Sequence, residues 1–268
     1  MADVPIEIRF PRPSVMGVIN VTPDSFSDGG VHLDPEVAAE GARRMVDEGA
    51  AIVDIGGEST RPGSDGVSVD EELRRVVPVL ERLAGGVPTS IDTAKPEVAR
   101  RALALGAELV NDVTAFRADP ELADVCAEHD AYVCLMHMQG DPRTMQDDPR
   151  YDDVAGEVAS FLEERMRFAI ERGVREDRIC LDPGIGFGKT LEHNVELIRR
   201  LDVLLALGRP VLIGISRKSS LRKLVGGDDL VIAGAAAAVT AFEHGASILR
   251  VHDVKAHVDA LTVASAFS

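Results

Sequence analysis

Short apolar runs alternate with longer segments of helical character along the whole chain. The apolar runs occupy eight stretches, at residues 15–21, 51–56, 89–92, 108–112, 131–137, 179–182, 211–216 and 248–252. Helical segments separate them, including residues 36–48, 97–105, 154–172, 191–207 and 235–244. Continuously apolar strands that alternate with helices are typical of a parallel sheet whose two faces are both covered.

A repeated sequence supports this alternation. The stretches "EGAAIVDIGG" (48–57), "LGAELVNDV" (105–113) and "HGASILRVHDV" (244–254) align without gaps on their Gly-Ala pair. Each follows a helical segment, which predicts a helix that ends at glycine and then a short buried strand. Eight such strands in 268 residues, with no break in composition, predict a single-domain (β/α)8 TIM barrel over residues 1–268. A doubly wound parallel sheet is the alternative.

Polar side chains gather where the predicted strands end, which in a barrel is the side of the active site. They are Asn20, Asp54, Glu58, Asp92, Asn111, Asp112, His137, Asp182, Ser216, Arg217, Lys218, Arg250, His252 and Asp253. The acidic and amide group at strands three, four and six suits a neutral heterocycle with adjacent N–H and C=O edges. The basic group at strands seven and eight suits an anion, and phosphate is common at this place in barrels.

The composition limits the partners and the compartment. Lys and Arg total 29 against 45 Asp and Glu, a net charge of −16, which argues against nucleic acid and acidic membranes as partners. The longest apolar stretch, 230–242, is too short to span a bilayer, and the first ten residues lack the apolar core of a signal peptide. Three cysteines, Cys126, Cys134 and Cys180, lack metal-site spacing and are interpreted as buried thiols. We therefore expect a cytoplasmic protein.

The stretch "LDPGIGFGKT" (181–190) looks like a nucleotide-binding loop, but one position argues against that function. A Walker A loop requires glycine six residues before its lysine, and here that residue is Pro183, which has no N–H to offer a phosphate. We therefore expect no nucleotide at this loop, and we expect Asp182 to matter more than Lys189. Two other glycine-rich loops, 22–30 and 56–66, follow the first two strands, and Arg61 in the second is suited to clamp an anion.

The sequence offers no tightly held metal site. It lacks the HExxH pattern, and its histidines are dispersed, which argues against zinc. A phosphorylated ligand can still bring Mg²⁺, which keeps most of its waters and needs only one or two protein oxygens. Asn20, at the end of the first strand, is the best candidate for that contact.

The motifs at the strand ends together resemble the dihydropteroate synthase family. The resemblance covers nearly the whole chain, in the order "MGVINVTPDSFSDGG", "VDIGGESTRPGS", "SIDT", "LVNDV", "MHMQGDPRTMQ", "LDPGIGFGKTLEHN", "GISRKS" and "LRVHDV". It implies an enzyme that joins 6-hydroxymethyl-7,8-dihydropterin diphosphate to p-aminobenzoate, with Mg²⁺ as cofactor, and that releases 7,8-dihydropteroate and pyrophosphate. It also implies a target of sulfonamides and a homodimer.

The resemblance assigns a role to each matching residue. The pterin is bound by Asp92, Asn111, Asp182 and Lys218. The diphosphate is held by Thr60, Arg250 and His252, with Asn20 as the Mg²⁺ contact. The p-aminobenzoate site is formed by Arg61, Pro62, Phe187, Lys218 and Ser219. The catalytic residues are Asp92, Lys218 and Arg61. The stretch "LDPGIGFGKT" thus supplies Asp182 to the pterin and Phe187 to p-aminobenzoate.

The expected chemistry is departure of pyrophosphate along an SN1-like path, because the electron-rich dihydropterin can carry the positive charge left behind. The p-aminobenzoate amine is already neutral at pH 7, so no strong general base is required. The chain departs from the family pattern at Ser220, Leu221 and Arg222, where a bulky and then a small residue are usual, which predicts a more open outer wall for p-aminobenzoate. Two alternatives are a pterin-binding methyltransferase domain, against which "SRKS" and "RVHD" argue, and an inactive pterin-binding relative.

Overall fold

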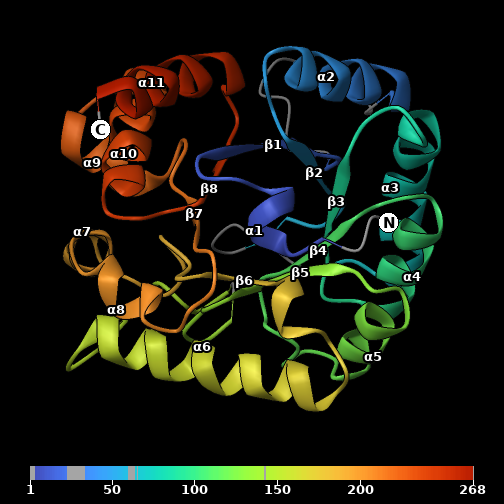
Figure 1. Cartoon of the computed structure of the whole chain (residues 1–268), viewed down its shortest axis with the longest axis horizontal. Helices are drawn as coiled ribbons and strands as arrows, with labels where there is room; N and C mark the ends of the chain where they lie inside the picture. Colours follow the sequence, from blue (N-terminus) through green and yellow to red (C-terminus); the bar gives the residue numbers. More distant parts are fainter. Residues whose placement is uncertain (1–3, 23–33, 60–63, 65, 142, 268) are drawn as a thin grey trace.

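Eight parallel strands form a barrel in the computed structural model of the chain, which describes residues 4–22, 34–59, 64, 66–141 and 143–267 (Figure 1). The strands are β1 (Ser14–Asn20), β2 (Ile52–Gly56), β3 (Thr89–Asp92), β4 (Leu109–Asp112), β5 (Tyr132–Met136), β6 (Ile179–Asp182), β7 (Leu212–Gly214) and β8 (Ile248–Val251). Their order in the sheet is β6-β5-β4-β3-β2-β1-β8-β7. The two ends of that order meet through a parallel bridge between Leu181 and Val211, and the Leu181 N–H donates to the Pro210 carbonyl at 2.9 Å. The predicted (β/α)8 barrel is confirmed, and the doubly wound alternative is wrong.

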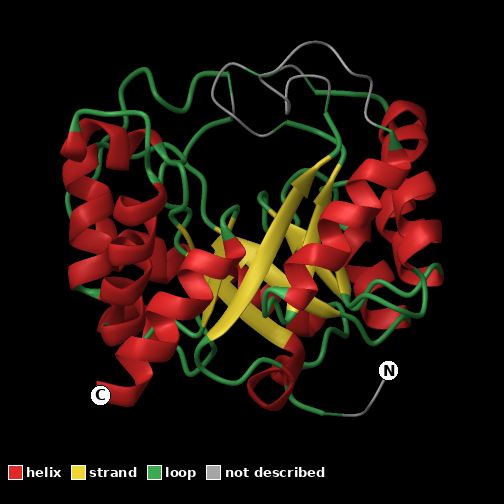
Figure 2. Cartoon of the chain, turned by 90° about the horizontal axis from the view of Figure 1, so that it is seen from above, coloured by secondary structure: helices red, strands yellow, loops and turns green. Residues whose placement is uncertain are grey.

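Helices surround the barrel on its outside (Figures 1 and 2). They are α2 (Pro35–Asp47), α3 (Val69–Leu83), α4 (Pro96–Ala104), α5 (Glu121–Glu128), α6 (Val154–Glu171), α7 (Leu191–Arg199), α8 (Leu201–Leu205), α9 (Ser219–Val225), α10 (Val231–Glu243) and α11 (Val254–Phe267). The helix expected over 191–207 is divided at Arg200, whose φ of −110° and ψ of 37° are not helical. None of the helices in the described part of the chain has the length and apolarity that crossing a membrane requires.

The predicted helix ends and strands agree with the structure to within a few residues. The repeated glycine closes α2, α4 and α10 with a positive φ, of 106° at Gly49, 100° at Gly106 and 109° at Gly245. Among the strands, the largest difference is at β7, which ends at Gly214, although the apolar run continues to 216. The chain turns there because Arg217 adopts a left-handed φ of 57° just before α9.

The barrel interior changes from apolar to polar along the strands. One layer consists of Met16, Ile52, Leu109, Tyr132, Cys134, Cys180, Leu212 and Ile248, all buried. Alternate residues of a strand face the same side, so the next interior positions lie two residues further on. On β2, β4, β6 and β8 those positions hold Asp54, Asn111, Asp182 and Arg250. The period of two therefore places the polar group directly above an apolar floor.

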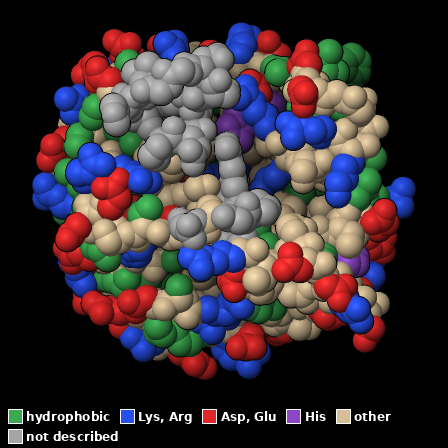
Figure 3. Space-filling model, turned by 180° about the vertical axis from the view of Figure 1, so that it is seen from behind, with side chains coloured by type: hydrophobic (Ala, Val, Ile, Leu, Met, Phe, Trp, Pro, Cys, Tyr) green, Lys and Arg blue, Asp and Glu red, His purple; other side chains and the backbone are tan. Residues whose placement is uncertain are grey.

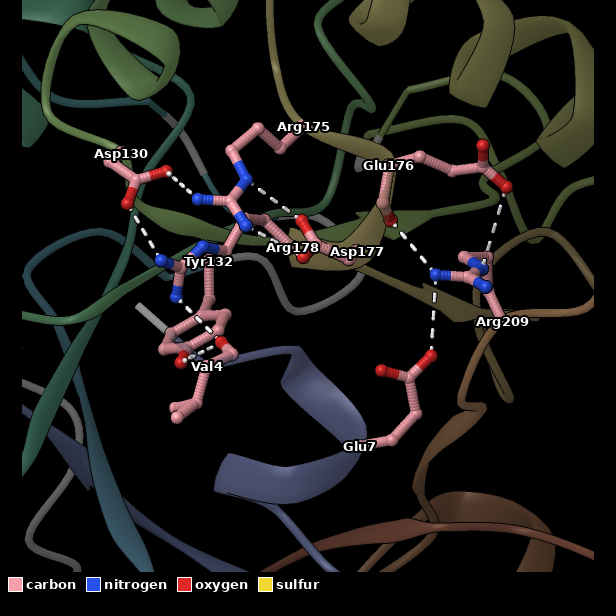
Figure 4. Close-up of polar contacts among 9 residues, drawn as sticks. All are labelled: Val4, Glu7, Asp130, Tyr132, Arg175, Glu176, Asp177, Arg178 and Arg209. Atoms are coloured by element: carbon pink, nitrogen blue, oxygen red, sulfur yellow. Dashed lines mark hydrogen bonds and ion pairs between the residues drawn. The ribbon is translucent and has the colours of Figure 1, made fainter. Parts of the chain in front are cut away.

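The amino-terminal segment closes the opposite end of the barrel. The short helix α1 (Ile6–Arg9) lies at the centre of the ring of strands (Figure 1), and Ile6 and Phe10 pack into the interior apolar layer. Arg178, in the short 3-10 helix η1 (Glu176–Arg178), donates to the Val4 carbonyl at 2.9 Å and to Asp130 at 2.6 Å (Figure 4). Ligands therefore have access from the other end of the barrel.

A second apolar layer lies between the strands and the surrounding helices and includes most of the buried residues. The three cysteines are buried free thiols, as the sequence indicated. Burial raises the pKa of the Cys126 thiol, so that it is protonated and inert at neutral pH.

Candidate active site

A small hollow opens at the carboxyl ends of the strands. Its polar lining is Asp92, Asn111, Asp182, Lys218 and Arg250, and its apolar lining includes Val113, Met136, Ile185 and Phe187. Figure 3 shows this face of the molecule, on which Lys and Arg side chains lie around a hollow. Polar residues from five separate strand ends or following loops thus meet at one place, as the barrel prediction required.

Asp54, on β2, links the polar residues of the hollow to one another. Its carboxylate is fully buried and accepts hydrogen bonds from Asn111 Nδ2 at 3.0 Å and from Ser90 Oγ at 2.5 Å. Arg250 Nε also donates to Asp54, at 2.7 Å, while Arg250 Nη2 donates to Asp92 at 2.9 Å. The sequence placed Asp54 at the mouth without a role. Its function as a shared acceptor becomes visible only when β2, β4 and β8 are brought together.

Burial changes the acid–base behaviour of the hollow. Loss of hydration raises the pKa of Asp92 to about 7, against the opposing effect of the Arg250 guanidinium. Burial also raises the pKa of Asp182, whose carboxylate accepts a hydrogen bond from the Gly184 N–H at 2.7 Å. Burial lowers the pKa of the Lys218 ammonium to about 8, and the nearby Asp182 opposes that effect. The pKa values of Asp92 and Lys218 therefore lie near neutral pH.

Phe187 and Lys218 form one wall of the hollow. The Lys218 ammonium lies 4.3 Å from the centre of the Phe187 ring, at a distance typical of a cation–π contact. Ser219 is exposed at the start of α9, outside the lining of the hollow. Ser220 is buried within α9, its hydroxyl has no hydrogen-bond partner among the described residues, and it too does not line the hollow.

The basic residues after β7 and β8 have different surroundings. Arg217 forms a bidentate ion pair with Asp253, in which Nε donates to Oδ2 at 3.0 Å and Nη2 donates to Oδ1 at 2.5 Å. The His252 N–H donates to Ser216 Oγ at 3.3 Å, and the ring Nδ1 lies equally close to the same oxygen. Burial, together with the positive charge of Arg250, lowers the pKa of His252 to about 3, so the imidazole is neutral. His252 can thus offer an anion a hydrogen bond, and Arg250 and Lys218 offer positive charge.

Asn20 lies beside the hollow, at the end of β1. A Cβ built on Gly56 would be 3.6 Å from Asn20 Oδ1 and 3.7 Å from Asp92 Oδ2, so both oxygens face the same small space. Mg²⁺ prefers oxygen ligands and needs only one or two from the protein, and Asn20 Oδ1 can supply one, whereas Asp92 Oδ2 already accepts a hydrogen bond from Arg250 Nη2. Within the described ranges, no group of three or more His, Cys, Asp or Glu side chains is arranged to hold a metal.

Three predicted site residues, Thr60, Arg61 and Pro62, lie outside the described residues. Their roles stay predictions. Lys189, which we expected to matter less than Asp182, has an unexpected environment. It is 3% exposed, and its ammonium lies 2.9 Å from Nδ1 of His137.

The fold and this site define a pterin-binding enzyme. A family model described as "Pterin binding enzyme" matches residues 16–252, and the chain belongs to that family. Within the family, it belongs to the dihydropteroate synthases. The dihydropteroate synthase of Neisseria meningitidis serogroup C is 49% identical to this chain over 262 residues, which cover 95% of this chain and 93% of that protein.

Solved structures of dihydropteroate synthases have the same fold. The Yersinia pestis enzyme, in a structure with a sulfonamide drug complex, has a TM-score of 0.91 at 45% identity and covers 96% of this chain and 94% of its own. The Xanthomonas albilineans enzyme with 4-aminobenzoic acid has a TM-score of 0.90 at 50% identity, with the same coverage. The family membership predicted from the motifs is confirmed.

Proposed function

We propose that this enzyme condenses 6-hydroxymethyl-7,8-dihydropterin diphosphate with p-aminobenzoate to give 7,8-dihydropteroate and pyrophosphate. The observation that supports this proposal most directly is the combination of Asp92, Asn111 and Asp182 above an apolar floor with Lys218 and Arg250 beside them. The related Xanthomonas albilineans enzyme has been solved with 4-aminobenzoic acid and with 7,8-dihydropteroate.

The pterin ring would occupy the hollow. A carboxylate accepts two hydrogen bonds from an N–C–N edge, and Asp182 is oriented for this by the Gly184 N–H. Asn111 offers both a donor and an acceptor, and Asp54 fixes its amide by accepting from Nδ2. The pterin would therefore meet groups that are already held in place, which lowers the entropy lost on binding.

The second substrate would bind next to Phe187 and Lys218, with Arg61, Pro62 and Ser219 completing its site. An aromatic ring can stack on Phe187, whose other contact is the Lys218 ammonium at 4.3 Å. The p-aminobenzoate amine is neutral at pH 7, so the site does not need a strong base. Binding in this position would bring the amine to the pterin methylene.

Pyrophosphate would leave along an SN1-like path. Arg250 would supply positive charge and His252 a hydrogen bond to the departing anion, with Thr60 as a further contact. Asp92 and Asp182, where ionised, would stabilise the cation that forms on the pterin. Asn20 would hold Mg²⁺ brought by the diphosphate, and a bound Mg²⁺ would neutralise part of the leaving charge.

The test is release of pyrophosphate from the pterin diphosphate by the purified enzyme, with and without p-aminobenzoate. Release that requires p-aminobenzoate, with formation of 7,8-dihydropteroate, is the expected result. Release that is equally fast without p-aminobenzoate, or no release, would contradict the proposal. Repeating the assay with EDTA and then with added Mg²⁺ tests the metal, since activity should fall and then return.

We also infer a cytoplasmic homodimer. The apolar side chains of Ile232 on α10 and of Val263 and Phe267 on α11 are 82%, 58% and 90% exposed. These two helices pack against each other, so the exposed side chains belong to one helical layer. A second copy that covered this layer would remove apolar surface from water.

A further inference from the structure

Three side chains donate hydrogen bonds to the backbone of the loop between β6 and α7. Three consecutive carbonyls of this loop each accept one hydrogen bond. Gln146 Nε2 donates to the Gly186 carbonyl at 2.5 Å, Lys189 Nζ donates to that of Phe187 at 2.9 Å, and Tyr151 OH donates to that of Gly188 at 2.8 Å. The middle residue of the three, Phe187, presents its ring to the hollow.

Lys189 is the buried member of this set. Its side chain is 3% exposed, and it makes no ion pair within the part of the chain that the structure describes. The ammonium contacts His137 Nδ1 at 2.9 Å and the His137 carbonyl at 3.4 Å, in addition to the Phe187 carbonyl. Burying an ammonium without a carboxylate is unfavourable unless its hydrogen bonds are made. The Lys189 side chain therefore depends on these three acceptors for its hydrogen bonds in the interior.

His137 is suited to accept the hydrogen bond. It lies at the end of β5, and its ring packs edge-on against Phe161 at 4.8 Å between centroids. Burial, and then the charge of Lys189, lowers the pKa of His137 to about 3, so the ring is neutral and Nδ1 can be an acceptor. The Tyr151 ring lies 6.0 Å from the Lys189 ammonium on another side. Lys189 thus joins the end of β5 to the loop after β6.

The loop has little room to move toward this support. A Cβ added at Gly188 would lie 2.6 Å from the Gln139 carbonyl, and one at Gly184 would lie 1.9 Å from the His137 carbonyl. Both approaches are to backbone atoms of the β5 side. The position of the Phe187 ring is therefore fixed by close packing together with the three hydrogen bonds.

We propose that Lys189 is a positioning residue for the second substrate: through His137 and the Phe187 carbonyl it fixes the Phe187 ring beside Lys218, with Gln146 and Tyr151 as auxiliary donors. The proposal rests on the proposed function, since p-aminobenzoate is the molecule that would stack on Phe187. Lys189 acts through Phe187 and not on the reacting atoms.

Lys189→Met tests the proposal, because methionine fills similar space without donors. We expect KM for p-aminobenzoate to rise about tenfold, the loss typical of one hydrogen bond, with a smaller change in kcat. The dissociation constant for the pterin diphosphate, measured by calorimetry, should change less than about twofold, because Lys189 makes no hydrogen bond to Asp92, Asn111 or Asp182. Backbone amides at 186–189 should exchange with solvent faster than in the wild type.

Two further comparisons keep the test independent of the folding of that variant. His137→Asn retains an acceptor near the Nδ1 position and should keep KM for p-aminobenzoate close to that of the wild type, whereas His137→Leu should raise it. Tyr132→Phe is the matched control, since it removes a buried hydroxyl contact, to the Val4 carbonyl at 2.8 Å, at the closed end of the barrel. That control should leave both substrate constants unchanged.

The outcomes separate this proposal from the proposed function. If wild-type enzyme does not use p-aminobenzoate, the proposed function fails. If the wild type does use it, the positioning role is refuted by an unchanged KM in folded Lys189→Met or by equal losses for the two substrates. Equal behaviour of His137→Asn and His137→Leu would refute the same role.

Discussion

Asp54 accepts three hydrogen bonds and is the negative charge closest to Arg250 on the floor of the site. Arg250 Nε lies 2.7 Å and Asn111 Nδ2 lies 3.0 Å from the same Asp54 oxygen. Two residues proposed to contact the substrate therefore depend on one residue that lies beneath them. A single buried acid at this place sets the orientation of both.

Asp54→Asn should destabilise the fold and weaken pterin binding. The amide keeps the shape but leaves Arg250 with only Asp92 as a buried partner, and breaking a buried pair typically costs about 3–5 kcal/mol. Urea unfolding and calorimetric binding of the pterin would measure both effects. Asp253→Asn is the control for stability, since it breaks the Arg217 pair, whose arginine is 56% exposed, and should cost no more than about 1 kcal/mol. Similar losses for the two variants would contradict the buried role.

The raised pKa of Asp92 predicts how stability depends on pH. Burial raises this pKa to about 7 in the folded protein, whereas an aspartate in the unfolded chain titrates near 4. The folded protein thus binds this proton more tightly, and its contribution to stability is complete below about pH 4 and is lost as pH rises toward 7. The unfolding free energy of the wild type should fall relative to that of Asp92→Asn across this window. A relative rise would mean that the Arg250 ion pair outweighs burial.

At the scale of elements, glycines that pack closely against the backbone at the end of β5 determine the path of the loop after β6. Gly184 has a φ of 69° and its N–H donates to Asp182, so the turn and the proposed pterin carboxylate are coupled. The glycine-rich pattern of this loop was visible in the sequence. Its cause is close backbone approach and not phosphate binding.

Gly184→Ala and Gly226→Ala form a matched pair for testing this account. Both glycines have a φ near 70°, but a Cβ at Gly226 meets nothing within 4 Å, whereas one at Gly184 would lie 1.9 Å from the His137 carbonyl. The left-handed conformation alone should cost Gly226→Ala about 1 kcal/mol. Gly184→Ala should cost roughly 1–3 kcal/mol more, from overpacking, and should also weaken pterin binding. Equal unfolding free energies for the two variants would mean that the loop moves aside without cost.

At the scale of the whole molecule, the two ends of the barrel have separate tasks. The end closed by α1 is held by Arg178, Tyr132 and Asp130 (Figure 4), while the opposite end is lined with the polar residues of the site. The helical layer of α10 and α11 lies on the outside, away from both. Changes in one of these regions should therefore have little effect on the others.

Ile232→Glu should convert the proposed dimer to a monomer. Ile232 is 82% exposed on α10, and a carboxylate there would be buried without a partner if a second copy covered it. Sedimentation velocity at micromolar concentration would measure the change. Ile8→Glu is the control, because Ile8 on α1 is also largely exposed, at 68%, but lies at the closed end. A wild-type monomer, or a dimer that survives Ile232→Glu, would count against this interface.

The sequence by itself determined the barrel, its strand order and the polar residues at the strand ends. Period-two patterning places Asp54, Asn111, Asp182 and Arg250 two positions beyond Ile52, Leu109, Cys180 and Ile248, and helix-closing glycines mark where three of the units begin. These signals are local, because they depend on strand and helix periodicity, so they can be read along one chain.

Only the tertiary structure decided which polar groups contact each other. The shared acceptor role of Asp54 needs β2, β4 and β8 to meet, and the sequence separation between Asp54 and Arg250 is 196 residues. The role of Lys189 was missed for the same reason, since His137 lies 52 residues away and on another strand. The burial of Ser220 also depends on packing. Hydrogen-bond partners and pKa values arise from distances and desolvation across the barrel, and neither is encoded in the order of residues along one element.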